Sequence, residues 1–128
     1  REALAAEGLE EVAVEDGDFT TDGGMRAMER IIDSGVEFDG LFIASDLMAQ
    51  GAVEVLRRTG RGVPEDVAVV GFDDSPIAVA VQPALTTMRQ PSLQQGEQMA
   101  GVLLDLLAGR NPPHATILGT ELVVRDST

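Results

Sequence analysis

The sequence predicts an α/β fold: a doubly wound, mostly parallel sheet with helices on both faces. Two continuous apolar runs, at residues 40–44 and 67–70, are typical of strands that are buried on both sides. The segments before and between them repeat apolar residues every three or four positions, as amphipathic helices do. Because short turns join these elements, the alternation requires right-handed crossovers and therefore a parallel sheet.

The first predicted elements precede residue 40. Residues 1–8 have the pattern of a helix end, and Val12–Val14 is predicted to be a short strand. The acidic, turn-rich residues 15–19 follow it. Thr20 or Thr21 can then cap a helix that ends at a glycine. The apolar positions of that helix are Met25, Met28 and Ile32.

The two apolar strands lead into polar residues. The run at 40–44 is followed by Ser45 and Asp46, and Asp46 is predicted to cap the next helix, which ends at Gly60. The apolar positions of this helix are Met48, Ala52, Val55 and Leu56. The strand at 67–70 then forms the centre of the predicted sheet.

The regular alternation of strands and helices ends in the second half of the chain. Residues 76–83 are bounded by two prolines, which predicts a short helix or an irregular segment, and residues 85–89 alternate as a strand does. Ser92 and Gln95 form a predicted capping box for an apolar helix over Leu93–Leu107. One or two final strands are predicted at Ile117–Leu118 and Leu122–Val124.

The composition excludes several classes of function. The 128 residues carry a formal net charge of −13, and all nine basic residues are arginines, so the chain by itself should repel nucleic acid. It has four Phe but no Tyr or Trp, which argues against a stacking platform for single strands. There is no Cys, one His and no apolar run long enough to span a membrane. We therefore expect no metal site, no cofactor and no membrane contact.

Two adjacent carboxylates follow the central strand in the motif Gly-Phe-Asp-Asp-Ser. Ligands of open α/β sheets bind beyond the carboxyl ends of the strands, so Asp73 and Asp74 are either hydrogen-bond acceptors for a polar ligand or caps of the next segment. Position favours the ligand role for Asp73 and the capping role for Asp74. A phosphoacceptor enzyme that binds Mg²⁺ is a third reading. It also requires a lysine, and the chain has none, nor a nucleophile–histidine pair. We expect no enzyme.

Four motifs in succession resemble a known family. They are Phe-Ile-Ala-Ser-Asp at 42–46, Pro-Glu-Asp-Val-Ala-Val-Val at 64–70, Gly-Phe-Asp-Asp-Ser at 71–75 and Pro-Ala-Leu-Thr-Thr-Met-Arg-Gln-Pro at 83–91. Their order and spacing are similar to the effector-binding core of the lactose/galactose-repressor (LacI/GalR) family. The resemblance covers the whole chain.

The resemblance implies a type I periplasmic-binding-protein-like core, of which this is an incomplete C-terminal lobe. Residues 1–90 would form that lobe, truncated at its start, residues 91–116 would cross to the other lobe, and residues 117–128 would return as closing strands. The family's helix-turn-helix, through which it binds operator DNA, and most of the N-terminal lobe would lie outside these residues.

The resemblance also implies a ligand site in the cleft between the lobes. Its ligand-binding residues would be Asp73, Phe19, Ser45 and Gln90, with carboxylate and amide groups bonding to hydroxyls and the ring packing on an apolar face. The alternatives are a core position for Phe19 and a hinge role for Gln90. Ser92 is read mainly as a helix cap.

A dimer surface is the other implied feature. Met48, Gln50, Ile77, Ala80 and Val81 fall on or near the family's two-fold axis, and the alternative is burial against the chain's own sheet. The resulting hypothesis is the effector-binding and homodimerisation part of a cytoplasmic transcriptional regulator that senses a small polar ligand, with a sugar as the default. The alternative is an exported solute receptor for sugar transport.

Overall fold

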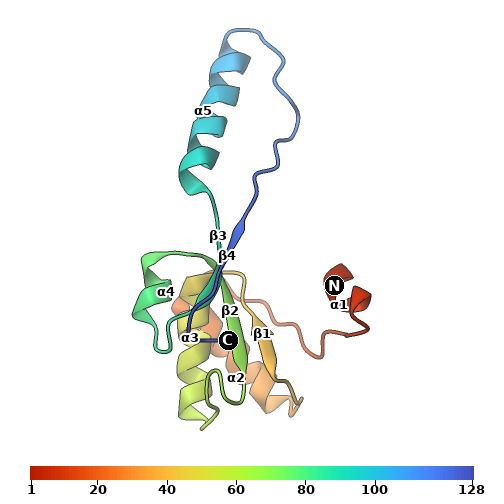
Figure 1. The fold of residues 1–128 in the computed structure, drawn as a ribbon, viewed down its shortest axis with the longest axis vertical. Helices are drawn as coiled ribbons and strands as arrows, with labels where there is room; N and C mark the ends of the chain where they lie inside the picture. Colours follow the sequence, from red (N-terminus) through yellow and green to blue (C-terminus); the bar gives the residue numbers. More distant parts are fainter.

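The computed structural model describes residues 1–128 and shows a body from which a long arm extends (Figure 1). The body holds the sheet with α2, α3 and α4. The arm consists of α5 and the segment that returns from it to the sheet, and α1 lies apart from both. In chain order the elements are α1 (Glu2–Ala6), α2 (Thr21–Asp33), β1 (Gly40–Phe42), α3 (Asp46–Arg58), β2 (Ala68–Asp73), α4 (Pro76–Ala80), β3 (Thr86–Arg89), α5 (Ser92–Leu107) and β4 (Glu121–Val123).

The sheet has the strand order β1-β2-β3-β4. The first three strands are parallel, with Phe42 opposite Val70 and Val70 opposite Thr86, and β4 runs antiparallel to β3. The α/β class with a mostly parallel sheet is therefore confirmed. The buried core lies on the face that α3 covers. On the opposite face the rings of Phe42 and Phe72 meet edge to face, and Phe42 remains 64% exposed.

One predicted strand is absent, and of the one or two strands predicted at the end of the chain one forms. Residues Val12–Val14 are exposed, and no strand lies beside them to accept or donate backbone hydrogen bonds. Ile117 is 96% exposed, and the final strand is limited to Glu121–Val123. Both predictions rested on local apolar patterns, but a strand exists only where a partner strand completes its backbone hydrogen bonds.

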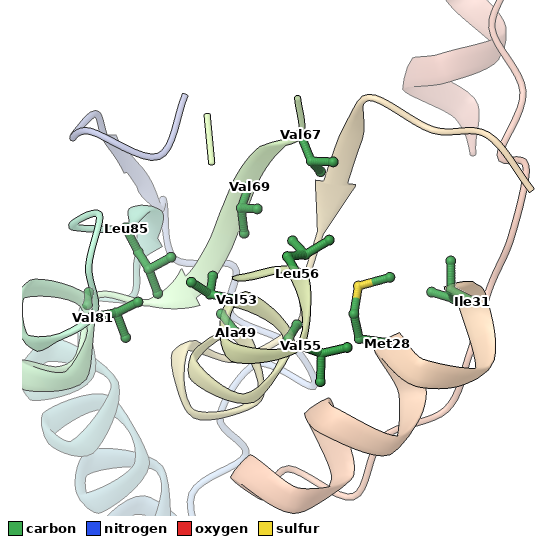
Figure 2. Close-up of a cluster of buried hydrophobic side chains, with 12 residues drawn as sticks. Met28, Ile31, Ala49, Val53, Val55, Leu56, Val67, Val69, Val81 and Leu85 are labelled. Atoms are coloured by element: carbon green, nitrogen blue, oxygen red, sulfur yellow. The ribbon is translucent and has the colours of Figure 1, made fainter. Parts of the chain in front are cut away.

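The hydrophobic core connects α2, α3 and β2 and reaches the segment after α4 (Figure 2). Leu56 of α3 is fully buried, and so is Val69 of β2. Figure 2 shows Met28 and Ile31 of α2 on one side of α3 and Val81 and Leu85 on the other. The apolar positions that predicted the two helices are thus the positions whose side chains face the core.

Two glycines allow α2 and α3 to pack closely. A Cβ atom on Gly24 would overlap the backbone of Met48, and a Cβ atom on Gly51 would overlap the carbonyl oxygen of Thr21. Both glycines are buried within helices. A side chain at either position would push the helices apart, so the helix pair depends on them.

The arm has no core of its own. None of the residues of α5 is buried, and the exposed apolar side chains include Leu93, Met99, Leu103, Leu106 and Leu107. The predicted capping box is wrong: Ser92 is the first residue of the helix, Pro91 precedes it, and no side chain caps the end. A proline N-cap has no hydroxyl to offer, and Ser92 lies one position too late to reach the free amides. No helix, α5 included, has the length and apolar character needed to cross a bilayer.

The C-terminal residues fasten the sheet. Ser127 is fully buried, and its hydroxyl donates to the carbonyl of Val69 at 2.6 Å and accepts from the amide of Thr86 at 2.8 Å. Its carbonyl accepts from the amide of Val69 at 2.8 Å. Ser127 therefore bridges β2 and β3 and holds the last segment against the body.

Candidate functional site

A polar pocket opens where β2 and β3 end and α5 begins. Its volume is about 530 Å³, and only one of its lining residues is hydrophobic. The lining residues are Asp73, Asp74, Arg89, Gln90, Pro91, Ser92, Leu93, Gln94 and Glu97. Carboxyl ends of neighbouring parallel strands converge at one edge of a sheet, which explains why residues far apart in sequence meet here. This pocket is the candidate site.

Asp73 and Gln90, two of the predicted ligand residues, are in direct contact there. The Gln90 side-chain amide donates to Oδ1 of Asp73 at 2.6 Å. Asp73 has a φ of +118°, a backbone conformation that residues other than glycine rarely adopt. One carboxylate oxygen of Asp73 has no protein partner among the observed hydrogen bonds, and the Gln90 amide retains further donor and acceptor capacity. The pair can therefore accept hydrogen bonds from the hydroxyl groups of a ligand and donate hydrogen bonds to them.

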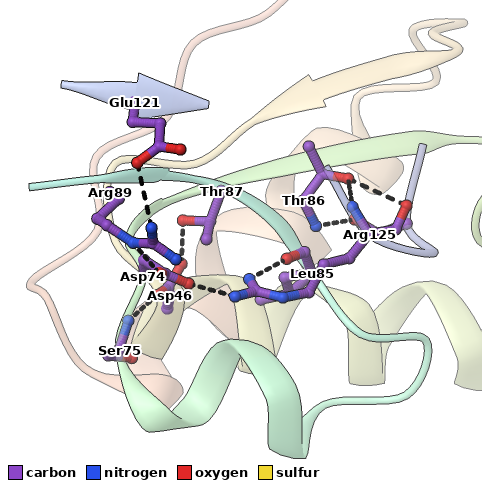
Figure 3. A network of polar contacts seen from close by, with 10 residues as sticks. Asp46, Asp74, Ser75, Leu85, Thr86, Thr87, Arg89, Glu121 and Arg125 are labelled. Carbon is purple, nitrogen blue, oxygen red and sulfur yellow. Dashed lines mark hydrogen bonds and ion pairs between the residues drawn. The ribbon is translucent and has the colours of Figure 1, made fainter. Parts of the chain in front are cut away.

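Asp74 neither caps a helix nor faces a ligand freely, which corrects its predicted capping role. Its Oδ1 accepts from Arg125 at 2.5 Å and its Oδ2 from Arg89 at 2.6 Å (Figure 3). The residue at the N-cap of α4 is Ser75, which makes no side-chain cap. The hydrogen bond from Arg125 outweighs the opposing effect of burial. Together with the weaker bond from Arg89, it keeps the pKa of the Asp74 carboxyl below its usual 3.8.

The structure gives the cap of α3 to Ser45 and not to Asp46, and the ligand role of Ser45 stays a prediction. Ser45 caps α3, because its Oγ accepts from the amide of Met48 at 3.2 Å, and only 5% of its surface is exposed. Asp46 is fully buried and accepts from the Ser75 amide and from the Thr87 hydroxyl, both at 2.7 Å (Figure 3). Asp46 was therefore wrongly predicted as the cap. Both of its hydrogen bonds come from outside its own helix.

Phe19 lies in the loop before α2, outside the lining of the pocket. Its φ is +58° and its side chain is 66% exposed, so the alternative of a core ring is wrong. Asp18 and Thr20 hold the loop: Asp18 accepts from the Thr20 amide at 3.1 Å and from Arg26 at 2.7 Å, and Thr20 caps α2. A left-handed bulky residue with an exposed ring is typical of functional loops, and the ligand role of Phe19 stays a prediction.

A second hollow of about 530 Å³ lies in the arm, between α5 and the returning segment. Half-exposed apolar residues of α5 line it, together with Pro113, His114 and Leu118 of the return. Six of its fourteen lining residues are hydrophobic, against one of nine around Asp73, and Gln90 borders both hollows. The hollow around Asp73 is therefore the more polar of the two.

The model of the periplasmic binding protein-like domain matches residues 1–128 of the chain. The chain belongs to this family. Its relatives include the HTH-type transcriptional regulator CelR of Thermobifida fusca, 47% identical over 99% of this chain and 38% of CelR. They also include MalR of Streptomyces coelicolor, 40% identical over 98% and 36% of the two chains. The chain thus spans a little over a third of the length of these regulators.

Solved structures agree with this membership. A complex of the transcriptional regulator CelR with cellobiose matches with a TM-score of 0.94 at 46% identity, over all of this chain and 40% of that one. A Lac repressor dimer bound to operator and an anti-inducer matches with a TM-score of 0.92 at 28% identity, over 99% and 44%. The resemblance to the effector-binding core of lactose/galactose repressors is confirmed.

The residues predicted for a dimer surface of this periplasmic-binding-protein-like chain divide into two groups. Met48 and Val81 are buried within the chain, at 7% and 6% exposure, and so belong to its own core. Gln50 and Ala80 are exposed, and Ile77 is partly buried against the core. Val79, beside them on α4, is 58% exposed. Of the predicted dimer residues, Gln50 and Ala80 are thus the exposed ones, and their place at a partner surface stays a prediction.

Sequence reasoning missed Arg125. This side chain is only 18% exposed and donates both to Asp74 and to the carbonyl of Leu85. The available signal was an arginine directly after an apolar strand in a chain of strongly acidic composition, since a buried arginine needs a carboxylate partner. The pattern predicted no particular partner because Asp74 is 51 residues away in sequence.

Proposed function

We propose that the chain is the effector-binding part of a LacI-type transcriptional regulator and that it binds a sugar in the pocket at the carboxyl ends of β2 and β3. The observation that carries the proposal is the contact between Asp73 and Gln90 in a pocket lined almost only by polar residues. Sugar hydroxyls require acceptors and donors close together, and a carboxylate can accept from two hydroxyls at once.

The relatives support the regulator and make a transport receptor the weaker alternative. They are HTH-type transcriptional regulators, and one structural relative was solved with cellobiose. We infer a homodimer in the cytoplasm, with the exposed residues Gln50, Val79 and Ala80 at the two-fold surface. Effector binding would favour one arrangement of the lobes and change the affinity of the dimer for operator DNA by linkage.

Phe19 completes the proposed site as the ring that packs on the apolar face of the sugar. Its side chain is 66% exposed, and Gly17 of the same loop lies against the side chain of Met48, in the first turn of the helix that follows β1. Ser45 has a smaller role in this proposal, because its side chain is only 5% exposed and its hydroxyl already accepts from the Met48 amide.

The test is calorimetric titration of cellobiose into the protein expressed from the complete gene, with Asp73→Asn and Asp73→Ala as variants. Loss of two hydrogen bonds to a carboxylate, each worth roughly 1.5–3 kcal/mol, weakens binding by about a hundredfold or more. Asp66→Asn is the control, since Asp66 is an exposed carboxylate that accepts only from the Gly62 amide. Unchanged affinity in both Asp73 variants would refute the site.

A further inference from the structure

The turn that follows β2 is held in an unfavourable backbone conformation. Asp73 and Asp74, two consecutive residues other than glycine, have φ values of +118° and +56°. Such conformations persist only where the surroundings enforce them, and they concentrate at functional sites. The conformation directs the Asp73 carboxylate toward Gln90 and the pocket, so whatever enforces it also determines the geometry of the site.

The strongest contacts of this turn belong to Asp74. Its side chain is only 9% exposed, and each of its carboxylate oxygens accepts from a different arginine, Arg125 and Arg89. Figure 3 shows the two guanidinium groups approaching the carboxylate from opposite sides. With both oxygens engaged, Asp74 has little capacity left for a ligand. Its contribution must lie in what the contacts hold in place.

Both arginines are themselves anchored in the sheet. Arg125 also donates to the carbonyl of Leu85 at 2.8 Å, and Arg89 also pairs with Glu121 of β4 at 3.1 Å. Arg89 is the residue before Gln90, the partner of Asp73. The ion pairs of Asp74 therefore fix the turn relative to β3, β4 and the residue that contacts the ligand-binding carboxylate.

A third element holds the next residue. The amide of Ser75 donates at 2.7 Å to the buried carboxylate of Asp46, at the start of α3. Residues 73–75 are thus held in succession by Gln90, by the two arginines and by Asp46. A turn held at every residue loses little freedom when a ligand binds, and this is the condition for a preorganised site.

We propose that Asp74 is a positioning residue of the effector site: its double ion pair enforces the strained turn that presents Asp73 to the ligand. This inference rests on the proposed function of Asp73 as the ligand acceptor. It assigns to the second carboxylate of the Gly-Phe-Asp-Asp-Ser motif a role distinct from ligand contact and from helix capping.

The experiment is a double-mutant cycle on the protein expressed from the complete gene, with cellobiose affinity measured by calorimetry. We expect Asp74→Asn to weaken binding about tenfold, because the turn relaxes and Asp73 must be ordered again on binding. In the background of Asp73→Asn, the same substitution should change affinity less than twofold, since its effect passes through Asp73. Independent, additive losses would overturn the positioning role.

The matched control is Glu54→Gln. Glu54 is also a carboxylate held by two arginines, Arg57 and Arg58, but it lies on the outer surface of α3. This substitution removes the same charge and the same kind of ion pair, and affinity should stay at the unaltered value. An equal loss in Glu54→Gln would assign the effect to net charge and overturn the inference.

A measurement without ligand separates this inference from the proposed function. Hydrogen–deuterium exchange of the peptide that covers residues 70–76 should be faster in Asp74→Asn and unchanged in Glu54→Gln. If the unaltered protein does not bind cellobiose, or if Asp73→Asn binds it equally well, the proposed sugar site is refuted. The exchange rate of residues 70–76 then decides by itself whether Asp74 holds the turn. Unchanged exchange in Asp74→Asn would overturn the inference even where sugar binding is confirmed.

Discussion

Asp46 offers the sharpest test of how this fold builds its site, through the substitution Asp46→Ala. The side chain is fully buried and accepts from the Thr87 hydroxyl of β3 and from the Ser75 amide after β2. Removal leaves both donors without a partner. An unsatisfied buried donor costs about 1–3 kcal/mol, and the Ser75 amide, which is only partly buried, belongs near the lower end.

The expected loss is therefore roughly 2–4 kcal/mol of the free energy of unfolding, out of a total of about 5–15 kcal/mol for a domain. Urea unfolding of the chain, followed by its helical circular dichroism, measures this loss. With a slope near 1.5 kcal/mol per molar urea, the midpoint falls by about 1–3 M. The control is Asp22→Ala, because Asp22 is an exposed acid in the first turn of α2, as Asp46 is in the first turn of α3.

Asp22→Ala should change stability by less than about 1 kcal/mol, the worth of an acid at a helix start. A loss in Asp46→Ala no larger than this would refute the account of the buried hydrogen bonds. Thr87→Val gives a second check. Since it removes one of the two donors, combining it with Asp46→Ala should cost less than the sum of the single substitutions.

Two further outcomes follow from the packing and the charges. Gly51→Ala should lower the free energy of unfolding by roughly 1–3 kcal/mol, because the added Cβ overlaps α2. Gly101→Ala, which adds a Cβ in open space on α5, should raise it by up to about 1 kcal/mol. Equal melting temperatures of the two variants would contradict the close contact between the helices. The ion pairs lower the pKa of Asp74 in the folded chain, so their contribution is complete above pH 3.8 and is lost as the pH falls through the depressed value. Asp74→Asn should therefore flatten the acid side of a plot of urea midpoint against pH, and an unchanged slope below about pH 4 would contradict this.

Local sequence determined most of the body. The apolar runs that predicted strands at 40–44 and 67–70 correspond to β1 and β2, and Thr20 caps α2 as one of the two predicted alternatives. These predictions succeed because the spacing of apolar residues within each segment determines which of its side chains are buried. The position of Asp73 and Gln90 at strand ends was also predictable, since neighbouring parallel strands end at one edge of the sheet.

The tertiary structure alone decided the rest. Ser45 and Asp46 are both good cap residues. In the structure the Asp46 carboxylate accepts from Thr87 and Ser75, and the Ser45 hydroxyl accepts from the helix amide of Met48. The local pattern of Val12–Val14 is that of a strand, yet no partner strand is present beside it. The strand pairing and the ion pairs depend on which groups from distant parts of the chain come within about 3 Å of each other. The local sequence pattern does not determine that distance.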